Sequence, residues 1–175
     1  MNVENSSELS RRIGDLKREK NAVILAHYYT TPEVQAVADF LGDSLALSVR
    51  AQSVDADIIL FAGVHFMAET AKVLCPEKKV LMPDASADCP MAHMVTKAEV
   101  DAAREAYEDL AVVCYINSTA EIKSWSDVSV TSANAVQIVA TCPIRISSLF
   151  PIKTSVASLR RRCLKKISFS SMATI

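Results

Sequence analysis

One stretch of the sequence decides the fold: Ala22-Val23-Ile24-Leu25-Ala26-His27-Tyr28-Tyr29-Thr30-Thr31-Pro32-Glu33. Its first five residues are all apolar, as in a strand that is buried on both faces of a parallel sheet. Thr31, Pro32 and Glu33 then form a strong helix start, because they supply a capping hydroxyl, a proline in the first turn and an acid near the helix N-terminus. A buried strand followed directly by a capped helix is typical of α/β proteins.

The same alternation continues along the chain. Thr96 and Glu99 form a capping box, which marks the start of another helix. Strands and helices that alternate with short loops predict three-layer αβα units with parallel sheets. The chain has only three glycines, too few for a glycine-rich phosphate loop. We expect strands at residues 22–26, 58–61, 80–82, 111–116 and 128–130, and helices at 6–20, 31–42, 43–52, 66–74, 96–107 and 133–139.

Length and composition indicate a cytoplasmic globular protein. Half of the 175 residues are apolar, which is enough for one ordinary core. No apolar run approaches the roughly 18 residues of a membrane span, and the first residues lack the layout of a signal peptide. In the cytoplasm, cysteines serve as thiols or metal ligands rather than as disulfides. Cys75, before a proline, and Cys114, inside an apolar run, suit the core.

The charge is distributed unevenly. Residues 1–127 contain all 20 acidic side chains and 12 lysines and arginines, whereas residues 128–175 contain seven basic side chains and no acid. Residues 140–175 also contain no glycine, and the helix caps and the strand alternation stop there. The basic run lacks interleaved aromatic residues and a recognition motif, so we expect no nucleic-acid partner and no membrane contact. We expect residues 140–175 to be a tail that is foreign to the fold.

Polar side chains follow each predicted strand. Ligands of open parallel α/β sheets bind outside the carboxyl ends of the strands, so these side chains share one rim. Imidazole, phenol, amide and hydroxyl groups there suit a small, carboxylate-bearing substrate. The rim residues are His27, Tyr28 and Tyr29, then His65, then Asp84, Ser86, Asp88 and Cys89, then Tyr115 and Asn117, and finally Thr131, Ser132 and Asn134.

Each rim residue also has a structural interpretation. A histidine such as His27 can simply make one hydrogen bond in a loop, and the neighbouring tyrosines can pack on the sheet edge. Asn117 and Ser132 are residue types that favour helix caps. Cys89 lies in a polar loop, which is an unusual place for a structural thiol. The residue pattern alone therefore predicts no more than a small-molecule site on an α/β rim.

Five motifs occur in order between residues 26 and 136. Together they resemble the quinolinate synthase family, and the resemblance covers residues 1–139, with a first α/β unit to about residue 85 and part of a second unit at residues 86–139. The motifs are Ala26-His27-Tyr28-Tyr29 with Asp39-Phe40-Leu41-Gly42-Asp43-Ser44, Gly63-Val64-His65-Phe66-Met67-Ala68-Glu69-Thr70-Ala71-Lys72, Pro83-Asp84 with Ala87-Asp88-Cys89 and Met91-Ala92, Tyr115-Ile116-Asn117-Ser118-Thr119-Ala120-Glu121-Ile122-Lys123, and Thr131-Ser132-Ala133-Asn134-Ala135-Val136.

The resemblance implies a transferase of NAD biosynthesis. Members of this family fold as three similar α/β units around a pseudo-threefold axis, and this chain resembles the first unit and part of the second. They condense iminoaspartate (iminosuccinate) with dihydroxyacetone phosphate to form quinolinate. Their cofactor is a [4Fe–4S] cluster, held by one cysteine from each unit, whose open iron acts as a Lewis acid.

The resemblance also implies roles for individual residues. Cys89 is the cluster ligand, Tyr29 and His27 are the catalytic residues, and Tyr29 is a candidate acid or base. The substrate-binding positions are His27, Ser44, Tyr115, Asn117 and Ser132, with backbone contacts from Ile116.

The chain departs from the family pattern in its cluster ligands. Cys142 and Cys163 lack the glycine-x-cysteine context of the family's later ligands, so only Cys89 matches. We therefore expect the 175-residue chain to hold no stable cluster and to be inactive as it stands. The alternative is a non-catalytic metabolite- or metal-binding module derived from the enzyme.

We expect residues from about 140 onward to be a frame-shifted translation of a quinolinate synthase gene. When codons are read from the third base of each written codon, the step from Phe150 to Pro151 gives only Pro or Ser, and the step from Lys153 to Thr154 gives only Asn or Asp. The offset frame can spell Phe-Ile-Pro-Asp-Gln-Asn-Leu-Gly, which resembles a family motif. Resequencing tests this, and an intact frame without Pro-Asp-x-Asn-Leu-Gly in the offset reading would contradict it.

Overall fold

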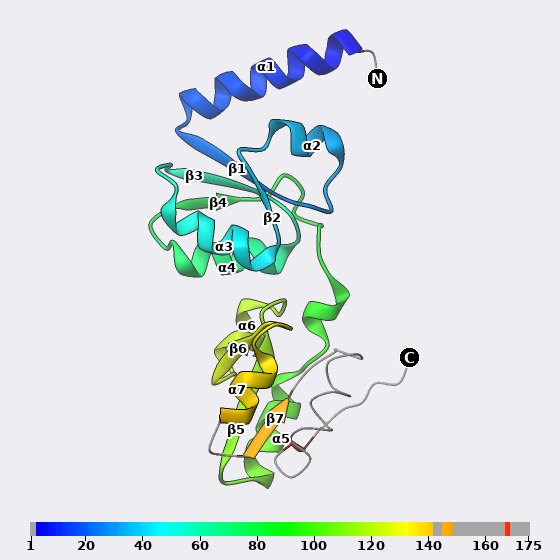
Figure 1. The fold of residues 1–175 in the computed structure, drawn as a ribbon, viewed down its shortest axis with the longest axis vertical. Helices are drawn as coiled ribbons and strands as arrows, with labels where there is room; N and C mark the ends of the chain where they lie inside the picture. Colours follow the sequence, from blue (N-terminus) through cyan, green and yellow to red (C-terminus); the bar gives the residue numbers. More distant parts are fainter. Residues whose placement is uncertain (1–2, 142–144, 149–166, 169–175) are drawn as a thin grey trace. The chain divides into compact units, whose positions relative to one another are not determined.

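The computed structural model describes residues 3–141, 145–148 and 167–168. The chain divides into two compact units, residues 1–89 and 90–175, and each unit contains a four-stranded sheet (Figure 1). Every strand pair in the described part of the chain is parallel. The predicted α/β class with parallel sheets is confirmed.

The first unit is a three-layer structure. Its sheet has the strand order β2-β1-β3-β4. Figure 1 shows α1 and α2 on one face of this sheet and α3 and α4 on the other. In chain order its elements are α1 (Val3–Glu19), β1 (Ala22–His27), α2 (Pro32–Val37), β2 (Phe40–Gly42), α3 (Ser44–Ser53), β3 (Ile58–Ala62), α4 (His65–Leu74) and β4 (Lys79–Leu81).

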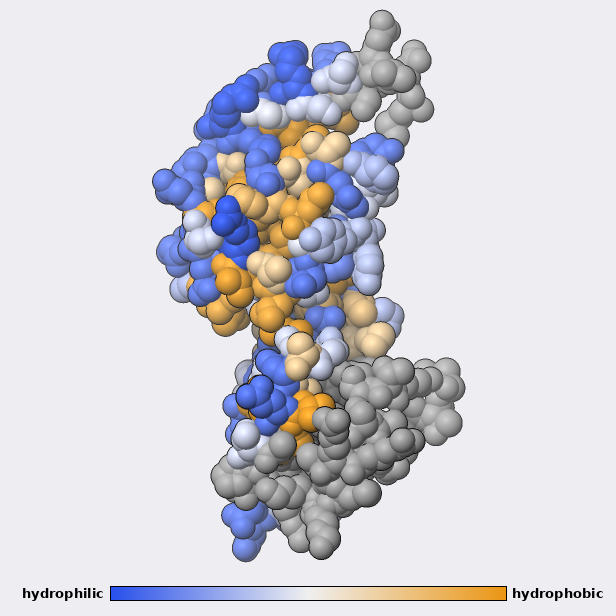
Figure 2. Space-filling model, in the orientation of Figure 1, coloured by the Kyte–Doolittle hydropathy of each residue, from blue (hydrophilic) through white to orange (hydrophobic). Residues whose placement is uncertain are grey.

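The central strands of this unit are buried, as their apolar runs predict. In β1 the four residues 23–26 are all buried, and Ile59 and Phe61 of β3 have no exposed surface. By contrast, the outer side of α1 is hydrophilic (Figure 2), and the ion pairs of Asp15 with Arg11 and Arg18 lie on this helix. Among the described helices none is both long enough and apolar enough to cross a membrane.

The second unit covers both faces of β5 with helices. Side chains that alternate along a strand face opposite sides of the sheet. Ala111 and Val113 of β5 pack in one cluster with α7, whereas Leu110 and Val112 pack in another with α5. The sheet order is β6-β5-β7-β8. The elements are η1 (Pro90–His93), α5 (Lys97–Ala106), β5 (Leu110–Tyr115), α6 (Ala120–Ser124), β6 (Val128–Val130), α7 (Ala135–Thr141), β7 (Arg145–Ser148) and β8 (Ile167–Ser168).

One predicted helix is wrong over its second half. The sequence predicts a helix at residues 31–42, but α2 ends at Val37 and residues 40–42 form the edge strand β2. The physical reason is Asp39, whose backbone N–H donates to Ile24 O at 2.9 Å and whose carboxylate accepts from Ile24 N at 2.8 Å. These bonds to β1 hold the following residues in a sheet rather than in a helix.

The expectation that strand structure stops at about residue 140 is also wrong in part. Residues 145–148 form β7, which pairs in parallel with β5 on one side and with β8 on the other. In this central position three of its four residues are polar by sequence, whereas β3 of the first unit reads Ile-Ile-Leu-Phe-Ala. Residues 142–144, 149–166 and 169–175 lie outside the described residues, and the proposed boundary at residue 139 stays a prediction.

The second unit repeats the hydrogen-bonding scheme of the first. Leu25 of β1 pairs with Phe40 of β2, and 88 residues later Val113 of β5 pairs with Val128 of β6. The two sheets also place their strands in the same order relative to the chain. The two units are therefore built on one plan, in which equivalent positions can be compared.

Shortening Phe61 to alanine should lower the free energy of unfolding by about 3–5 kcal/mol, because this side chain is completely buried and its loss leaves a cavity. The matched control is Val73→Ala on α4, where 67% of the residue's surface is exposed and the cost should stay within about 0.5 kcal/mol. Urea titrations followed by circular dichroism measure both values. Equal effects of the two substitutions would contradict the assignment of Phe61 to the core.

Candidate functional site

The rim of the first unit is organised around His27, the last residue of β1. Its Nδ1 atom accepts a hydrogen bond from Tyr29 N at 3.1 Å, and the two rings lie edge to face with centroids 4.6 Å apart. Tyr29 is 93% exposed, so its phenol is open to solvent beside the imidazole. The structure thus brings together the two residues predicted to be catalytic.

The surroundings of His27 favour its neutral form. Its pKa lies below the ordinary value of 6.5, chiefly because burial disfavours the charged ring, while the negative charge of Asp43 partly opposes this effect. Since Nδ1 accepts a hydrogen bond, the proton of the neutral ring lies on Nε2. His27 can therefore donate a hydrogen bond from Nε2 to a carboxylate or carbonyl oxygen of a ligand.

Ser44 lies at the start of α3, just after the edge strand β2. Parallel pairing places Gly42 opposite His27, so both residues are at the carboxyl ends of neighbouring strands. The helix cap is Asp43, whose carboxylate accepts from Ala46 N at 2.8 Å. Asp43 was not among the predicted site residues, although its position between Gly42 and Ser44 was the available signal.

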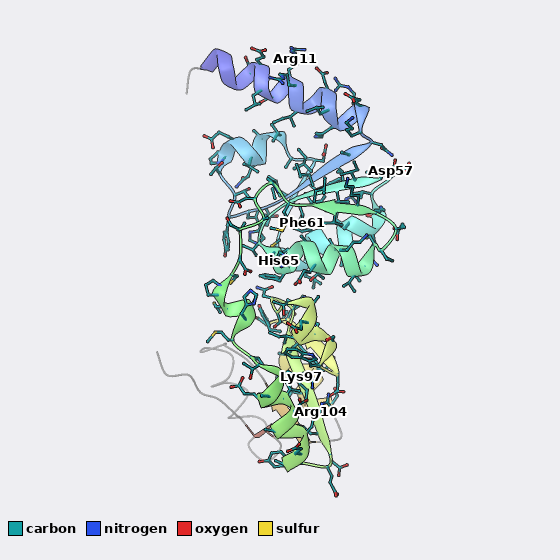
Figure 3. All side chains as sticks on the ribbon, turned by 180° about the vertical axis from the view of Figure 1, so that it is seen from behind. Arg11, Asp57, Phe61, His65, Lys97 and Arg104 are labelled. Atoms are coloured by element: carbon teal, nitrogen blue, oxygen red, sulfur yellow. The ribbon has the colours of Figure 1, made fainter. Side chains whose placement is uncertain are left out.

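The loop that contains Cys89 is attached to the same edge of this sheet. His65, at the start of α4 just after β3 (Figure 3), donates from its backbone N–H to Ala87 O at 2.9 Å. Earlier in the loop, hydrogen bonds from the Ser86 hydroxyl and N–H lower the pKa of Asp84. Cys89 itself is partly buried. The loop is thereby held at the carboxyl ends of the strands, as the sequence predicts.

The rim of the second unit contains a hydrogen-bonded pair. The phenol oxygen of Tyr115, at the end of β5, lies 3.0 Å from the hydroxyl oxygen of Ser132, which follows β6. Ile116 donates its backbone N–H to Val130 O at 2.9 Å, so a backbone contact of this residue with a ligand would have to use its carbonyl. Asn117 follows directly and is partly buried. These four residues lie at one edge of the sheet, as predicted.

The interpretation of Asn117 as a helix cap is wrong, and the Ser132 hydroxyl has a different partner. Thr119 caps α6, since its side chain accepts from Ile122 N at 3.2 Å. At the turn before α7, the Asn134 side chain accepts from Thr131 N at 2.7 Å, while the Ser132 hydroxyl bonds to Tyr115. The sequence predicts one rim for all these residues, but the strands form two sheets, so each unit has a rim of its own. That residues of both units line one cavity is a prediction from the sequence.

The described residues do not supply a complete metal site. They contain no group of three or more His, Cys, Asp or Glu side chains that could hold a metal ion. Cys75 and Cys114 are buried in the core, as predicted, and burial raises the pKa of the Cys75 thiol. Cys89 is the one partly exposed thiol among the described cysteines. Because clusters of the [4Fe–4S] type are held by several thiolates, this set does not fit the cluster by itself.

The fold and the rims define an α/β protein with polar groups at the carboxyl ends of parallel strands, a class that binds small molecules at that edge. A sequence model of the family described as "Quinolinate synthetase A protein" matches residues 11–154. The chain belongs to the quinolinate synthase family.

Named relatives agree with this assignment. The quinolinate synthase of Prosthecochloris aestuarii is 57% identical over 137 residues, which cover 78% of this chain and 42% of that protein. The Thermococcus onnurineus enzyme is 50% identical over 160 residues, 91% of this chain and 53% of that protein. The Pyrococcus furiosus enzyme is 56% identical over 137 residues, 78% of this chain and 45% of that protein. The chain thus spans about half the length of these relatives.

A solved structure, the E-1-hydroxy-2-methyl-but-2-enyl-4-diphosphate reductase of Plasmodium falciparum, is also similar. It is 11% identical, with a TM-score of 0.31, over 97% of this chain and 62% of that chain. A similarity of this size supports no conclusion about function.

The low pKa of His27 predicts a pH-dependent stability. The folded protein favours the neutral ring, so the contribution of His27 is fully present above pH 6.5 and falls as the pH decreases below that value. In His27→Asn this part of the pH dependence should disappear. In Asp43→Asn, which keeps an oxygen at the cap, the pKa of His27 should fall further. NMR titration of the imidazole measures the pKa, and a value above 6.5 would contradict the assignment.

Proposed function

We propose that this chain contributes to the quinolinate synthase reaction, the condensation of iminoaspartate with dihydroxyacetone phosphate in NAD biosynthesis. The observation that carries the proposal is that the family's motif residues lie at the carboxyl ends of parallel strands in both units. His27 ends β1, and Tyr115, in hydrogen-bond contact with Ser132, ends β5. Family membership supplies the identity of the substrates.

The donors at the first rim suit an anionic substrate. His27 offers its Nε2–H, and the Ser44 hydroxyl follows the neighbouring strand β2. In our proposal these two groups bind a carboxylate of iminoaspartate. Tyr29, whose exposed phenol lies beside the His27 ring, moves protons to and from the reacting atoms.

At the second rim, hydroxyl and amide groups hold the substrate's remaining polar atoms. The Tyr115 and Ser132 hydroxyls can each donate or accept, so the pair can pass a proton between its two oxygens. The Asn117 side chain adds an amide donor and acceptor. Hydrogen-bonding groups that are already in position stabilise charge that develops during a reaction.

Cys89 is proposed as one ligand of a [4Fe–4S] cluster. Such a cluster supplies a Lewis acid that polarises substrate oxygen atoms. Cys89 is partly exposed in a loop held at the rim, and these features distinguish it from the core thiols Cys75 and Cys114. A single thiolate does not hold a cluster, so we propose that the 175-residue chain alone is inactive.

The decisive experiment compares the isolated chain with a fusion. Residues 1–139 replace the matching front of the Pyrococcus furiosus quinolinate synthase. After anaerobic reconstitution the fusion should form quinolinate and retain about four irons per chain, whereas the 175-residue chain should do neither. Cys89→Ala in the fusion should abolish the bound iron, and Cys75→Ala serves as its matched control.

Two results would contradict the proposal. A correctly folded fusion that retains iron but forms no quinolinate would favour a non-catalytic module. Stable binding of about four irons by the isolated chain, abolished by Cys89→Ala, would refute the claim that one thiolate is insufficient.

A further inference from the structure

Each unit has an aspartate just before its edge strand. In the first unit, Asp39 accepts from Ile24 N at 2.8 Å and donates its own N–H to Ile24 O at 2.9 Å. In the second unit, Asp127 accepts from Val112 N at 2.7 Å and donates to Val112 O at 2.8 Å. Asp39 comes 15 residues after Ile24, Asp127 comes 15 residues after Val112, and the two aspartates are 88 residues apart. The two units thus share one interaction in detail.

Each aspartate also binds a cation from the helix that comes before the central strand, α1 before β1 and α5 before β5. Lys17 of α1 donates to Asp39 at 2.7 Å, and Arg104 of α5 (Figure 3) donates to Asp127 at 3.1 Å. Each cation also donates to the backbone carbonyl two residues before its aspartate, at 3.2 Å and 3.1 Å respectively. We call each group, Asp39 with Lys17 and Asp127 with Arg104, a register clamp.

The register clamps act on one short edge strand in each sheet. β2 and β6 are edge strands of only three residues, so few backbone hydrogen bonds fix their register. A slip of one residue would move such a strand by about 3.3 Å and turn its side chains to the other face. The observed register places Gly42 opposite His27 and Val130 opposite Tyr115. Ser44 and Ser132 each follow two residues later.

We propose that Asp39 and Asp127 are positioning residues for the rim. By fixing the register of an edge strand, Asp39 holds Ser44 beside His27, and Asp127 holds Ser132 within hydrogen-bond distance of Tyr115. Neither aspartate touches the substrate. The inference deepens the proposed function and rests on it for the meaning of the rim, but its structural part can be tested without activity.

The test uses NMR on the full chain, with labelled tyrosine and histidine rings as reporters. Asp127→Ala should shift the Tyr115 ring signals and leave those of His27 unchanged. Asp39→Ala should do the reverse, because each clamp acts inside its own unit. The two variants are thus matched controls for each other. If a substitution only lowered the overall stability, the Tyr115 and His27 ring signals of the folded protein would both stay unchanged or would both shift. Either result would contradict the proposal.

A double-mutant cycle shows whether Asp127 acts through Ser132. Ser132→Ala removes the hydrogen bond to Tyr115 directly and gives the reference shift. Asp127→Ala should shift the Tyr115 signals in the same direction, and the double variant should add little to either single change. Fully additive shifts would overturn the proposal. Unchanged Tyr115 signals in Asp127→Ala, together with a lower urea midpoint, would show that the clamp only stabilises the unit.

A milder substitution, Asp127→Asn, keeps the proposal testable if Asp127→Ala fails to fold. Asp127→Asn keeps an oxygen that accepts from Val112 N but loses the charge that binds Arg104, so its shift should be smaller than that of Asp127→Ala. In the active fusion, Asp127→Ala should lower kcat/KM about as much as Ser132→Ala, with no further loss in the double variant. If the fusion proves inactive while the NMR shifts occur, the proposed function fails and the register clamp stands.

Discussion

Parallel strand pairing is the constraint on which the rest of this structure depends. All strand pairs in the described part of the chain are parallel, so every strand of a sheet ends at the same edge. The described connections between successive strands of a sheet up to β7 return across a face of the sheet through a helix, and such helices bury the central strands on both sides. Polar residues that follow the strands are therefore gathered at one edge of each unit, where His27 and Tyr115 lie.

Sequence alone predicts the features that local physics controls. Buried strands such as β1 and β3 are visible as apolar runs, and the Thr96–Glu99 capping box marks the start of α5 correctly. The edge strand β2 could not be found in this way, because Phe40-Leu41-Gly42 also fits the last turn of a helix that ends at a glycine. Its existence depends on Asp39 bonding to Ile24, a contact between residues far apart in the chain.

The same distinction applies to the candidate site. The positions of His27 and Tyr115 at strand ends follow from the strand pattern, whereas their hydrogen-bond partners do not. Ser44 is implied by the family resemblance alone, because the sequence predicts a helix where the strand that precedes it lies. The bond between Ser132 and Tyr115 depends on the register of β6 against β5. Asn117 is a good capping residue in isolation, but Thr119 takes that role because of where α6 begins. Which side chains meet across neighbouring strands depends on the tertiary fold and cannot be read from a local stretch of sequence.

The spacing of the paired strands has a consequence for how the chain folds. Leu25 and Phe40 are 15 residues apart along the chain, whereas Ala22 and Ile58 are 36 apart. Closing the shorter loop costs less chain entropy, by about 0.8 kcal/mol in the simple polymer estimate. Within each unit, the pairing of the central strand with the edge strand after the aspartate (β1 with β2, and β5 with β6) therefore needs the smallest loss of chain entropy. The central pair has the longer crossover, and non-local pairings of this kind are the slow ones to form in parallel sheets.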